Sequence, residues 1–344
     1  MRILIIGGSK FLGRHLSDSA IARGHDLTVF NRGKISASAG SGVEYIQGDR
    51  HKDLGKLAGN MWDAVIDTCG YLPQSLDVST KTLNNSVGRY VFISSISAYA
   101  GFEKLGMDET SSLAELTDEQ RARFAEFDLS QDVTAPVLGE AYGPLKAACE
   151  RVVTRTMGDK ALNVRPGLIV GPYDPTDRFT YWVMRVARGG EFVAPGRPER
   201  PVQFVDARDL SDWTIRAVEN ALAGDFNLNG RPGGISMGGA LDAIRDTVNE
   251  AAAPVWVDEA FIEREEVQPW GELPLFLPES DASYAGFMDV NIDKALDTGL
   301  NIRPIDETVK DTFEWRRGES FPMRAGISPE REAELLRKWS EQTP

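Results

Sequence analysis

Three residues in the middle of the chain have side chains suited to proton transfer. Tyr142 and Lys146 lie four positions apart, and Pro144 between them fits the first turn of a helix. The phenol and the ammonium are therefore expected one turn apart on one helix face. A tyrosine with a pKa of about 10 is a poor base at neutral pH, and a nearby ammonium together with an oxidised nicotinamide would lower that pKa. Ser95, which follows an apolar run, would donate a hydrogen bond to the reacting oxygen. The set predicts proton exchange at a hydroxyl or carbonyl oxygen.

A glycine-rich turn near the first residue has the features of a dinucleotide site. The apolar run Arg2–Ile6 predicts a buried strand, and Lys10–Arg23 predicts an amphipathic helix. Glycines between them allow a sharp turn and close approach to a pyrophosphate, whose charge is stabilised at the helix N-terminus. The last glycine would allow close packing of helix on strand. The residues expected to bind a cofactor here are Gly7, Gly8, Ser9, Lys10, Phe11, Leu12 and Gly13.

The end of the second strand favours NADP(H) over NAD(H). A carboxylate there would bind the ribose 2′-hydroxyl of NAD, whereas a cation accommodates the 2′-phosphate of NADP. The strand ends in Asn31-Arg32 with no carboxylate, and Lys10 adds a second cation. Both cations could instead be solvated surface residues, so NAD(H) stays open. Asp49, after the third strand, is placed either to meet the adenine amino group or to form a turn.

Alternating strands and helices in the first half predict an α/β fold, a Rossmann-type doubly wound parallel sheet. The strand candidates are short apolar runs rich in β-branched residues, and helical patterns separate them. After Arg2–Ile6 the expected strands are Leu27–Phe30, Val43–Ile46, Ala64–Ile66, Tyr90–Ile93 and Leu162–Val164, and the expected helices are Gln74–Asn85 and Tyr142–Thr156.

The second half is expected to form a smaller, mixed α/β substrate domain. After Pro166 the alternation loosens, and glycine and proline become frequent. We therefore divide the chain into a cofactor domain, residues 1–170, and a mainly substrate-binding domain, residues 171–344, with some segments returning to the first. Helices are expected at Arg178–Arg188, Ala207–Ala221, Met237–Asn249, Glu307–Arg317 and Pro329–Ser340, and short strands at Gln203–Val205 and Phe226–Leu228.

An acidic insertion separates the two parts of the expected proton-transfer site. Residues 101–140 contain ten acidic and three basic residues. Residues 117–120 are typical of a capping box, and Leu116, Phe124 and Phe127 could form one face of the helix that follows. The insertion is either a solvated surface segment or a lid over the site.

Composition excludes several classes of protein. The chain has 344 residues, of which 42% are hydrophobic and 26% charged, values ordinary for a folded domain. Its net charge of −14 opposes binding to nucleic acid or to an acidic membrane surface. No stretch approaches the roughly 20 apolar residues of a membrane span. Two cysteines, Cys69 and Cys149, are too few for a disulfide framework and lack metal-ligand spacing, so we expect no metal and a cytoplasmic location.

In order and spacing the motifs resemble the short-chain dehydrogenase/reductase superfamily. More narrowly they are similar to its extended or atypical branch, the NAD-dependent epimerase/dehydratase family, over most of the chain. The resemblance implies that Ser95, Tyr142 and Lys146 are catalytic, and that Lys146 also holds the nicotinamide ribose. It further implies cofactor contacts from the neighbouring strand ends, namely Ser94, Pro166, Gly167 and Leu168.

Departures from the family pattern bear on the reaction. Family dehydratases carry an acidic pair where this chain has Ile96 and Ser97, which argues against elimination of water. Members that work beside a carbonyl add a cysteine or histidine. Here Cys149 is most simply a packing residue, and the histidines are all in the cofactor half, where we expect them at the surface: His15, His25 and His51.

The expected substrate differs from a nucleotide sugar. Nucleotide-sugar members have a diphosphate-binding arginine at the position of Val202, although Arg200 is close, and Lys294 is the only cation in residues 265–302. Aromatic residues would suit an uncharged, partly apolar substrate if they face a pocket, or they pack in the core. These residues are Tyr181, Trp182, Trp270, Phe276, Tyr284 and Phe287.

The resulting interpretation is an NAD(P)(H)-dependent oxidoreductase acting on a carbonyl or secondary alcohol of a small molecule, with Tyr142 exchanging the proton. A sugar epimerase with retained cofactor is an alternative, because it needs no acid or base beyond Tyr142. A non-catalytic dinucleotide sensor or an RNA-binding relative is an alternative of another class. The negative charge opposes RNA binding, and the intact Ser95–Tyr142–Lys146 set opposes a pure sensor. We expect a monomer or a homodimer.

Overall fold

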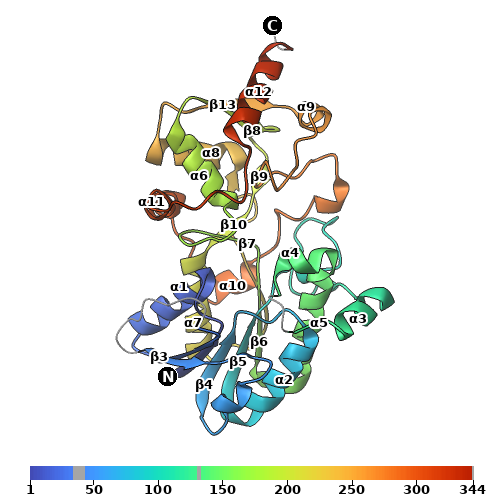
Figure 1. Ribbon diagram of the computed structural model, residues 1–344, viewed down its shortest axis with the longest axis vertical. Coiled ribbons are helices and arrows are strands. Elements are labelled where there is room, and N and C mark those ends of the chain that lie inside the picture. The colour runs from blue at the N-terminus through green and yellow to red at the C-terminus, as the bar shows by residue number, and fades with distance from the viewer. Residues whose placement is uncertain (34–42, 130–132, 343–344) are drawn as a thin grey trace.

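The computed structural model describes residues 1–33, 43–129 and 133–342. Residues 130–132 of the acidic insertion therefore lie outside the described residues. The molecule is elongated, with the N-terminus in the part built on a large sheet and the C-terminus at the far end of a second part (Figure 1).

A seven-stranded parallel sheet organises the first part, which confirms the predicted fold class. Its strand order is β11-β6-β5-β4-β1-β2-β3, and every pairing is parallel. The bounds are β1 Arg2–Ile6, β2 Asp26–Asn31, β3 Val43–Gln47, β4 Trp62–Asp67, β5 Val87–Ile93, β6 Ala161–Pro166 and β11 Gly224–Leu228.

Helices cover both faces of this sheet because its central strands are apolar on both sides. Ile3 and Ile5 of β1 join the core beneath α1 (Phe11–Ala22) and α7 (Ala207–Glu219). Leu4 and Ile6 point the other way, toward α2 (Pro73–Leu83) and α5 (Tyr142–Met157). Figure 1 shows the two helical layers on either side of the strands.

The second part has its own apolar core between helices and short strands. Its helices are α6 (Arg178–Arg188), α8 (Met237–Val248), α9 (Glu259–Arg264), α11 (Ile305–Arg316) and α12 (Pro329–Ser340). Three two-stranded sheets complete it or link it to the first part: β7 (Leu168–Val170) with β10 (Phe204–Asp206), β9 (Pro201–Val202) with β12 (Ile235–Ser236), and β8 (Glu191–Pro195) with β13 (Ala253–Val257).

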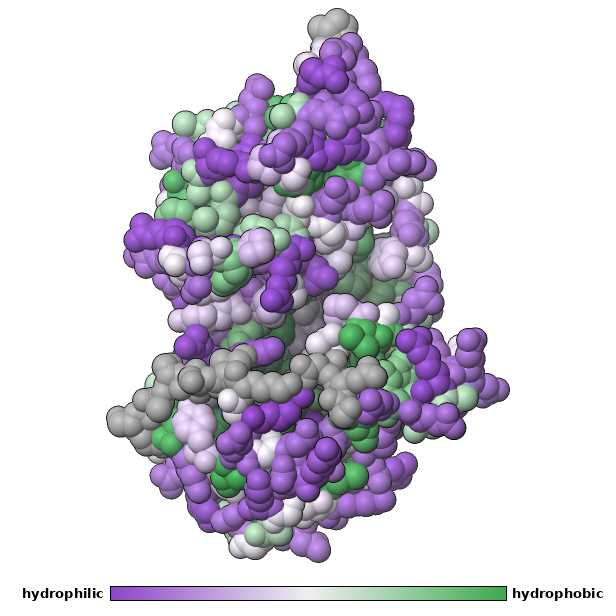
Figure 2. Space-filling model, in the orientation of Figure 1, coloured by the Kyte–Doolittle hydropathy of each residue, from purple (hydrophilic) through white to green (hydrophobic). Residues whose placement is uncertain are grey.

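The chain crosses between the two parts several times. After β6 it enters the second part, returns for α7 and β11, and returns again for α10 (Asp293–Asp297), which packs beside β11. Three segments of the second half, α7, β11 and α10, therefore pack with the large sheet of the first part. Figure 2 shows the surface narrowing to a waist between the two parts. Among the described residues, no helix is both long and apolar enough to cross a membrane.

Candidate active site

The carboxyl ends of the central strands lie at one edge of the sheet. In the strand register Ile6 pairs with both Phe30 and Asp67, Asp67 pairs with Phe92, and Ile93 pairs with Val164. The loops that follow β1, β2, β4, β5 and β6 therefore start side by side. Ligands of open parallel sheets bind at this edge.

The turn after β1 has the geometry that a dinucleotide requires. Gly7 and Gly8 have φ values of 105° and 72°, in the left-handed region that favours glycine. A Cβ atom on Gly13 would lie 2.4 Å from the Cα atom of Gly8, so α1 packs directly on the turn. The predicted close approach of helix and turn is confirmed.

The N-terminus of α1 is open to an anion. Lys10 is the N-cap, and its side chain makes no capping hydrogen bond. The first turn contains no acidic residue, so the positive end of the helix dipole and the free N–H groups of that turn can interact with an anion. Lys10 is exposed, Ser9 and Phe11 are half-buried, and the side chain of Leu12 packs in the core, which leaves Leu12 only its backbone for a ligand.

The residues after β2 and β3 form tight turns. The Asn31 side-chain oxygen accepts from Gly33 N at 2.7 Å, and Arg32 is exposed. Asp49 Oδ1 accepts from His51 N at 2.8 Å, which is the turn that the sequence left as one alternative.

Ser94 and Ser95 follow β5 directly. Ser95 Oγ accepts from Ser97 N at 3.1 Å and so caps the short 3₁₀ helix η3 (Ile96–Ala98). Ser94 Oγ is buried with no hydrogen-bond partner among the described residues. A buried polar atom without a partner is costly, so it fits a site that a polar ligand completes.

Gly143 brings α5 against this turn. A Cβ atom at Gly143 would lie 2.1 Å from the Ser97 carbonyl oxygen, so only glycine permits the approach. Tyr142 is thereby held next to Ser95, whose hydroxyl contacts the phenol. The sequence analysis did not identify this role of Gly143, because close approach depends on a residue 46 positions away.

The pKa of Tyr142 is raised in the protein alone. Burial raises it, and the hydrogen bond with Ser95 opposes that rise in part. The expected lowering by the Lys146 ammonium together with an oxidised nicotinamide stays a prediction. Lys146 instead faces inward. Its Nζ donates to Gly70 O at 2.9 Å and to Ile93 O at 2.8 Å, and burial lowers its pKa to about 8.

Pro166, Gly167 and Leu168 lie where the chain leaves the sheet. Pro166 pairs with Leu228 at the end of β6, and Gly167 N donates to Leu228 O at 3.0 Å. Leu168 then begins β7 and packs against the core of the second part. The three residues thus stand at the same sheet edge as the serines.

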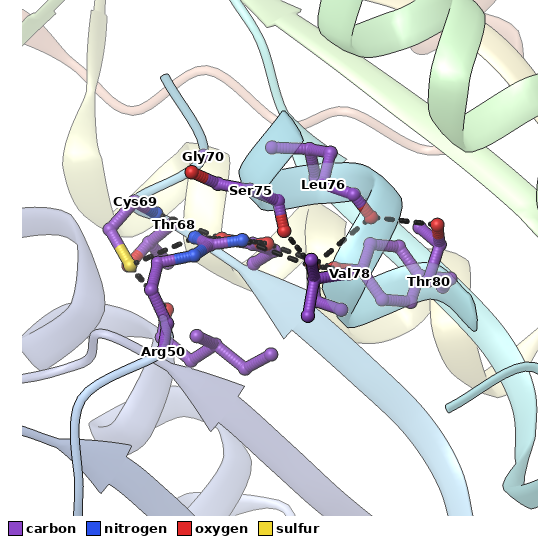
Figure 3. A network of polar contacts seen from close by, with 12 residues as sticks. Arg50, Thr68, Cys69, Gly70, Ser75, Leu76, Val78 and Thr80 are labelled. Carbon is purple, nitrogen blue, oxygen red and sulfur yellow. Dashed lines mark hydrogen bonds and ion pairs between the residues drawn. The ribbon is translucent and has the colours of Figure 1, made fainter. Parts of the chain in front are cut away.

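A buried ion pair fixes two of the loops at this edge. Arg50, after β3, makes two 2.8 Å hydrogen bonds to Asp67 at the end of β4, and the Tyr90 hydroxyl donates to the same carboxylate. Arg50 also donates to Cys69 and Ser79 (Figure 3). The Arg50 ion pair holds the pKa of Asp67 below its usual value despite complete burial. This network was not predicted, since it joins strands that are neighbours only in the fold.

The acidic insertion packs beside Tyr142. The capping box is present, with α3 running from Asp118 to Ala125. Phe124 is buried with Leu72, Leu138 and Leu145, and Leu116, Phe127 and Tyr142 pack against the same cluster. The three residues predicted to form one helix face do pack in this cluster, but only Phe124 lies within α3, whereas Leu116 and Phe127 lie just outside its ends.

The prediction that the histidines lie at the surface is wrong for His15 and also for the His25 side chain, which is only 8% exposed. His15 is buried and its Nε2 lies 3.0 Å from Pro172 O, a contact with a residue 157 positions away. Burial lowers the pKa of His15. His25 pairs with Glu219 at 2.9 Å, and His51 is half-buried near Ser75. Cys149 is buried in the core, as expected of a packing residue.

The cations considered for phosphate binding have other partners. Arg200 pairs with Glu259 at 3.2 Å, and Lys294 donates to Asp225 O at 2.7 Å. Of the aromatic residues, Tyr181, Trp182 and Phe276 are buried in the core, whereas Tyr284 is exposed. Trp270 and Phe287 are half-buried, with ring centroids 5.3 Å apart.

One further cation near these rings was missed by the sequence analysis. Arg178, the first residue of α6, is half-buried and lies 5.3 Å from the Trp270 ring centroid. Trp270 has a φ of 63°, which a bulky side chain rarely adopts, and its N–H lies within 3.1 Å of both Leu273 O and Phe276 O. No motif or spacing in the sequence predicts the contact between Arg178 and Trp270.

Comparison with known proteins gives a consistent result. The sequence model of the NAD dependent epimerase/dehydratase family matches residues 3–228. The chloroplast stem-loop binding protein of 41 kDa b from Arabidopsis thaliana is 22% identical over 254 residues, which cover 67% of this chain. The matched region spans 58% of that relative's length.

Solved epimerase structures share the fold. UDP-glucuronic acid 4-epimerase from Bacillus cereus in complex with NAD gives a TM-score of 0.65 at 14% identity, covering 92% of this chain and 99% of the other. WbmH from Bordetella bronchiseptica in complex with NAD+ gives 0.66 at 15% identity, covering 92% and 98%. UDP-N-acetylglucosamine 4-epimerase from Methanobrevibacter ruminantium M1 in complex with UDP-N-acetylmuramic acid gives 0.67 at 14% identity, covering 93% and 99%.

The fold and the family match define the class of protein, a Rossmann-type α/β protein with the architecture of the solved epimerases. The chain belongs to the NAD dependent epimerase/dehydratase family, as the family model covers well over half of it.

Proposed function

We propose that the protein transfers a hydride between a nicotinamide dinucleotide and a carbonyl or secondary alcohol carbon of a small molecule. The observation that carries the proposal is one sheet edge that holds the glycine turn, Ser95, Tyr142 and Lys146 together. A bound nicotinamide dinucleotide would supply or accept the hydride there.

The residues present fit such a cofactor. Gly7 to Gly13 and the open N-terminus of α1 suit the pyrophosphate. Ser94, whose buried hydroxyl has no partner in the described part of the chain, and Pro166 to Leu168 suit the nicotinamide end. Lys146 has one N–H beyond its two carbonyl acceptors, which is the donor a ribose hydroxyl would need.

Tyr142 exchanges the proton with the substrate oxygen, and Ser95 donates a hydrogen bond that holds this oxygen beside the phenol. The raised pKa of Tyr142 keeps the phenol protonated, which suits a proton donor in the direction of carbonyl reduction. In the reverse direction the positive charge of Lys146 and of an oxidised nicotinamide would favour the phenolate.

NADP(H) is the cofactor we favour. The described end of β2, Asn31 to Gly33, offers an exposed arginine and no carboxylate to a 2′-substituent. Asp49 keeps one oxygen outside its turn, and we assign that oxygen to the adenine amino group. The solved neighbours in complex with NAD make NAD(H) the competing choice.

The second part, within residues 171–344, would bind the substrate, while residues 1–170 bind the cofactor. We further propose a cytoplasmic protein, as its two cysteines are unpaired, with either one or two copies in the active form.

The experiment is a search for turnover. The purified protein is mixed with NADPH or NADH and a panel of aldehydes and ketones, and absorbance at the nicotinamide band is followed. The proposal expects oxidation of cofactor with at least one carbonyl class and faster reaction with NADPH. Absence of reaction with the whole panel, in either direction and with both cofactors, would overturn it.

A sugar epimerase is the second candidate. Several structural neighbours are described as epimerases, and no acid or base beyond Tyr142 is needed for that reaction. It predicts NAD that stays bound through purification and is released only on denaturation.

RNA binding is a third candidate, because one relative is a stem-loop binding protein. The charge of −14 predicts no shift of a labelled RNA stem-loop in a gel at physiological salt.

A further inference from the structure

Lys146 is enclosed by two aromatic rings as well as by two carbonyl groups. Its Nζ lies 4.7 Å from the Tyr71 ring centroid and 4.8 Å from that of Phe92. Gly70 O and Ile93 O accept its hydrogen bonds. No carboxylate in the described residues lies within ion-pair distance of the ammonium, so carbonyls and ring faces are its closest partners.

The two rings have different positions. Phe92, in β5, is fully buried in the core. Tyr71 is half-buried, lies in the loop between β4 and α2, and follows the Gly70 carbonyl that Lys146 contacts. Its ring also lies against Tyr142, with centroids 6.5 Å apart and planes tilted by 44°. Among the residues that the structure describes, Tyr71 is therefore the ring in contact with both members of the proposed proton-transfer pair.

We propose that Tyr71 is a positioning residue, whose ring face holds the Lys146 ammonium in its charged form and supports the Tyr142 ring. The proposal rests on the proposed function insofar as Lys146 and Tyr142 are its catalytic pair. The contacts of Tyr71 themselves do not depend on any substrate.

The physical basis is the negative face of an aromatic ring. A cation over such a face is stabilised, and more strongly where water is excluded. Burial lowers the pKa of Lys146 to about 8, so a modest further fall in this pKa would remove the positive charge at neutral pH. The titratable groups that face the ammonium are few. Asp67 at the end of β4 and Glu150 on α5 favour the charged form, whereas burial raises the pKa of the Cys69 and Cys149 thiols and so disfavours the thiolates that would do the same.

The ring, rather than the hydroxyl, is expected to act. Burial and the neighbouring phenol of Tyr142 raise the pKa of Tyr71 above its ordinary value, so Tyr71 stays neutral near pH 7. A phenylalanine at this position would keep the ring face, whereas a leucine would keep an apolar cover without it.

The test measures the pKa of Lys146 directly, by nuclear magnetic resonance of ¹⁵N,¹³C-labelled lysine side chains across pH 6–10. Lys146→Arg assigns the signal. Tyr71→Leu should lower the pKa by about half a unit to one unit, the range expected for loss of one cation–π contact. Tyr71→Phe should leave it unchanged. Tyr45→Leu, at an exposed tyrosine of β3, is the matched control and should also leave it unchanged.

Two outcomes would overturn the proposal. An unchanged pKa in Tyr71→Leu would mean that the ring face does not hold the charge, and a rise would mean that the ring only keeps water out. If Tyr71→Leu does not fold, as judged by its thermal unfolding, Tyr71→Met replaces it with the same expected shift.

The failure of the proposed function is distinguishable from this result, because the titration needs no substrate. A lowered Lys146 pKa in a protein without turnover would refute the function and leave the role of Tyr71 standing. Where turnover is found, the alkaline limb of kcat should move to lower pH in Tyr71→Leu by the same shift, while Tyr71→Phe restores it. A loss of kcat with an unmoved limb would contradict the role of Tyr71.

Discussion

The two parts of the molecule are built from contacts of different range. At the sheet edge, the residues proposed to bind cofactor or transfer the proton come from short continuous stretches, such as Gly7 to Gly13 and Tyr142 to Lys146. In the second part, β8 pairs with β13 some sixty residues later, and Arg185 of α6 pairs with Glu332 of α12, 147 residues away. The site residues of the first part can therefore be recognised from local motifs, although its sheet also joins distant residues such as Tyr90 and Ala161. The second part shows long-range pairing without such motifs.

Each part also has one buried arginine–glutamate pair. Arg165 of β6 contacts Glu150 of α5 at 2.7 Å and Asp225 at 3.1 Å. Arg185 contacts Glu332 at 2.5 Å and otherwise relies on carbonyl groups. Arg165 thus has a second carboxylate within ion-pair distance, whereas in the described part of the chain Arg185 pairs with Glu332 alone. Changes in the two parts can therefore be compared directly.

The largest expected effect is on the chemistry of the sheet edge. Tyr142→Phe removes the proton donor and should lower kcat by about 10²–10⁴-fold. Cofactor affinity, followed by nicotinamide fluorescence, should change less than twofold. Tyr45→Phe, at an exposed tyrosine, is the control. Turnover that survives in Tyr142→Phe would remove Tyr142 from the proton-transfer role.

Breaking the two buried pairs compares the stability of the parts. Glu332→Leu should destabilise the protein by about 3–5 kcal/mol, because Arg185 is left buried without a carboxylate. Glu150→Leu should cost less, since Asp225 still faces Arg165. Denaturant unfolding measures both. Glu341→Leu, at an exposed pair with Arg337, should have no measurable effect.

The same unfolding curves test how independent the parts are. The chain crosses between them repeatedly, so we expect one cooperative transition in every variant. A Glu332→Leu curve that splits into two transitions would mean that the second part unfolds alone.

Gly13→Ala should distort the glycine turn after β1 and leave the structure of the second part unchanged. The new Cβ would lie 2.4 Å from a backbone atom of Gly8, so the turn must move. We expect a loss of about 1–3 kcal/mol in stability and at least tenfold weaker binding of NADH or NADPH. Gly55→Ala, where an added Cβ meets nothing within 4 Å, is the control. Equal binding by the two variants would argue against the turn as the pyrophosphate site.

The smallest expected effect is on the pH dependence of folding stability. It concerns Asp174, in the loop between β7 and α6. Burial raises the pKa of Asp174 to about 6, so its neutral form is favoured in the folded state. The resulting stability is fully present below about pH 4, the unfolded-state pKa, and is lost as pH rises through about 6. Asp174→Asn should remove this carboxyl's share of the loss, so that stability falls less steeply between these pH values. Chemical unfolding at a series of pH values measures the slope, and an unaltered slope would assign it to other groups.

The sequence predicted most elements of the fold, because their signals are local. The bounds of α6 and α12 agree with the expected residues, and Ser328 caps α12 by accepting from Arg331 N. The pairing of β8 with β13 was not predicted. β8 ends in Pro195, and neither apolar run contains a signal that identifies the strand it pairs with. Periodicity identifies which face is apolar but cannot say what covers it.

The candidate site was predictable to a similar extent. The positions of Ser95, Tyr142 and Lys146 at one edge follow from strand ends and one helix turn. The contacts of Gly143, Tyr71 and Arg50 do not, because each depends on a side chain or carbonyl brought close only by the fold. The rise in the pKa of Tyr142 in the protein alone was not predicted for the same reason. Burial of the phenol outweighs a charge whose nearest partners are carbonyls and rings.

The central claim is that the sheet edge binds an exchangeable nicotinamide cofactor. The most direct measurement is a fluorescence titration of the purified protein with NADPH and NADH, after release of any carried cofactor has been checked by denaturation. Saturable binding of both, tighter for NADPH and weakened at least tenfold in Gly13→Ala, is the predicted result. No saturable binding of either, in protein free of carried cofactor, would contradict the account.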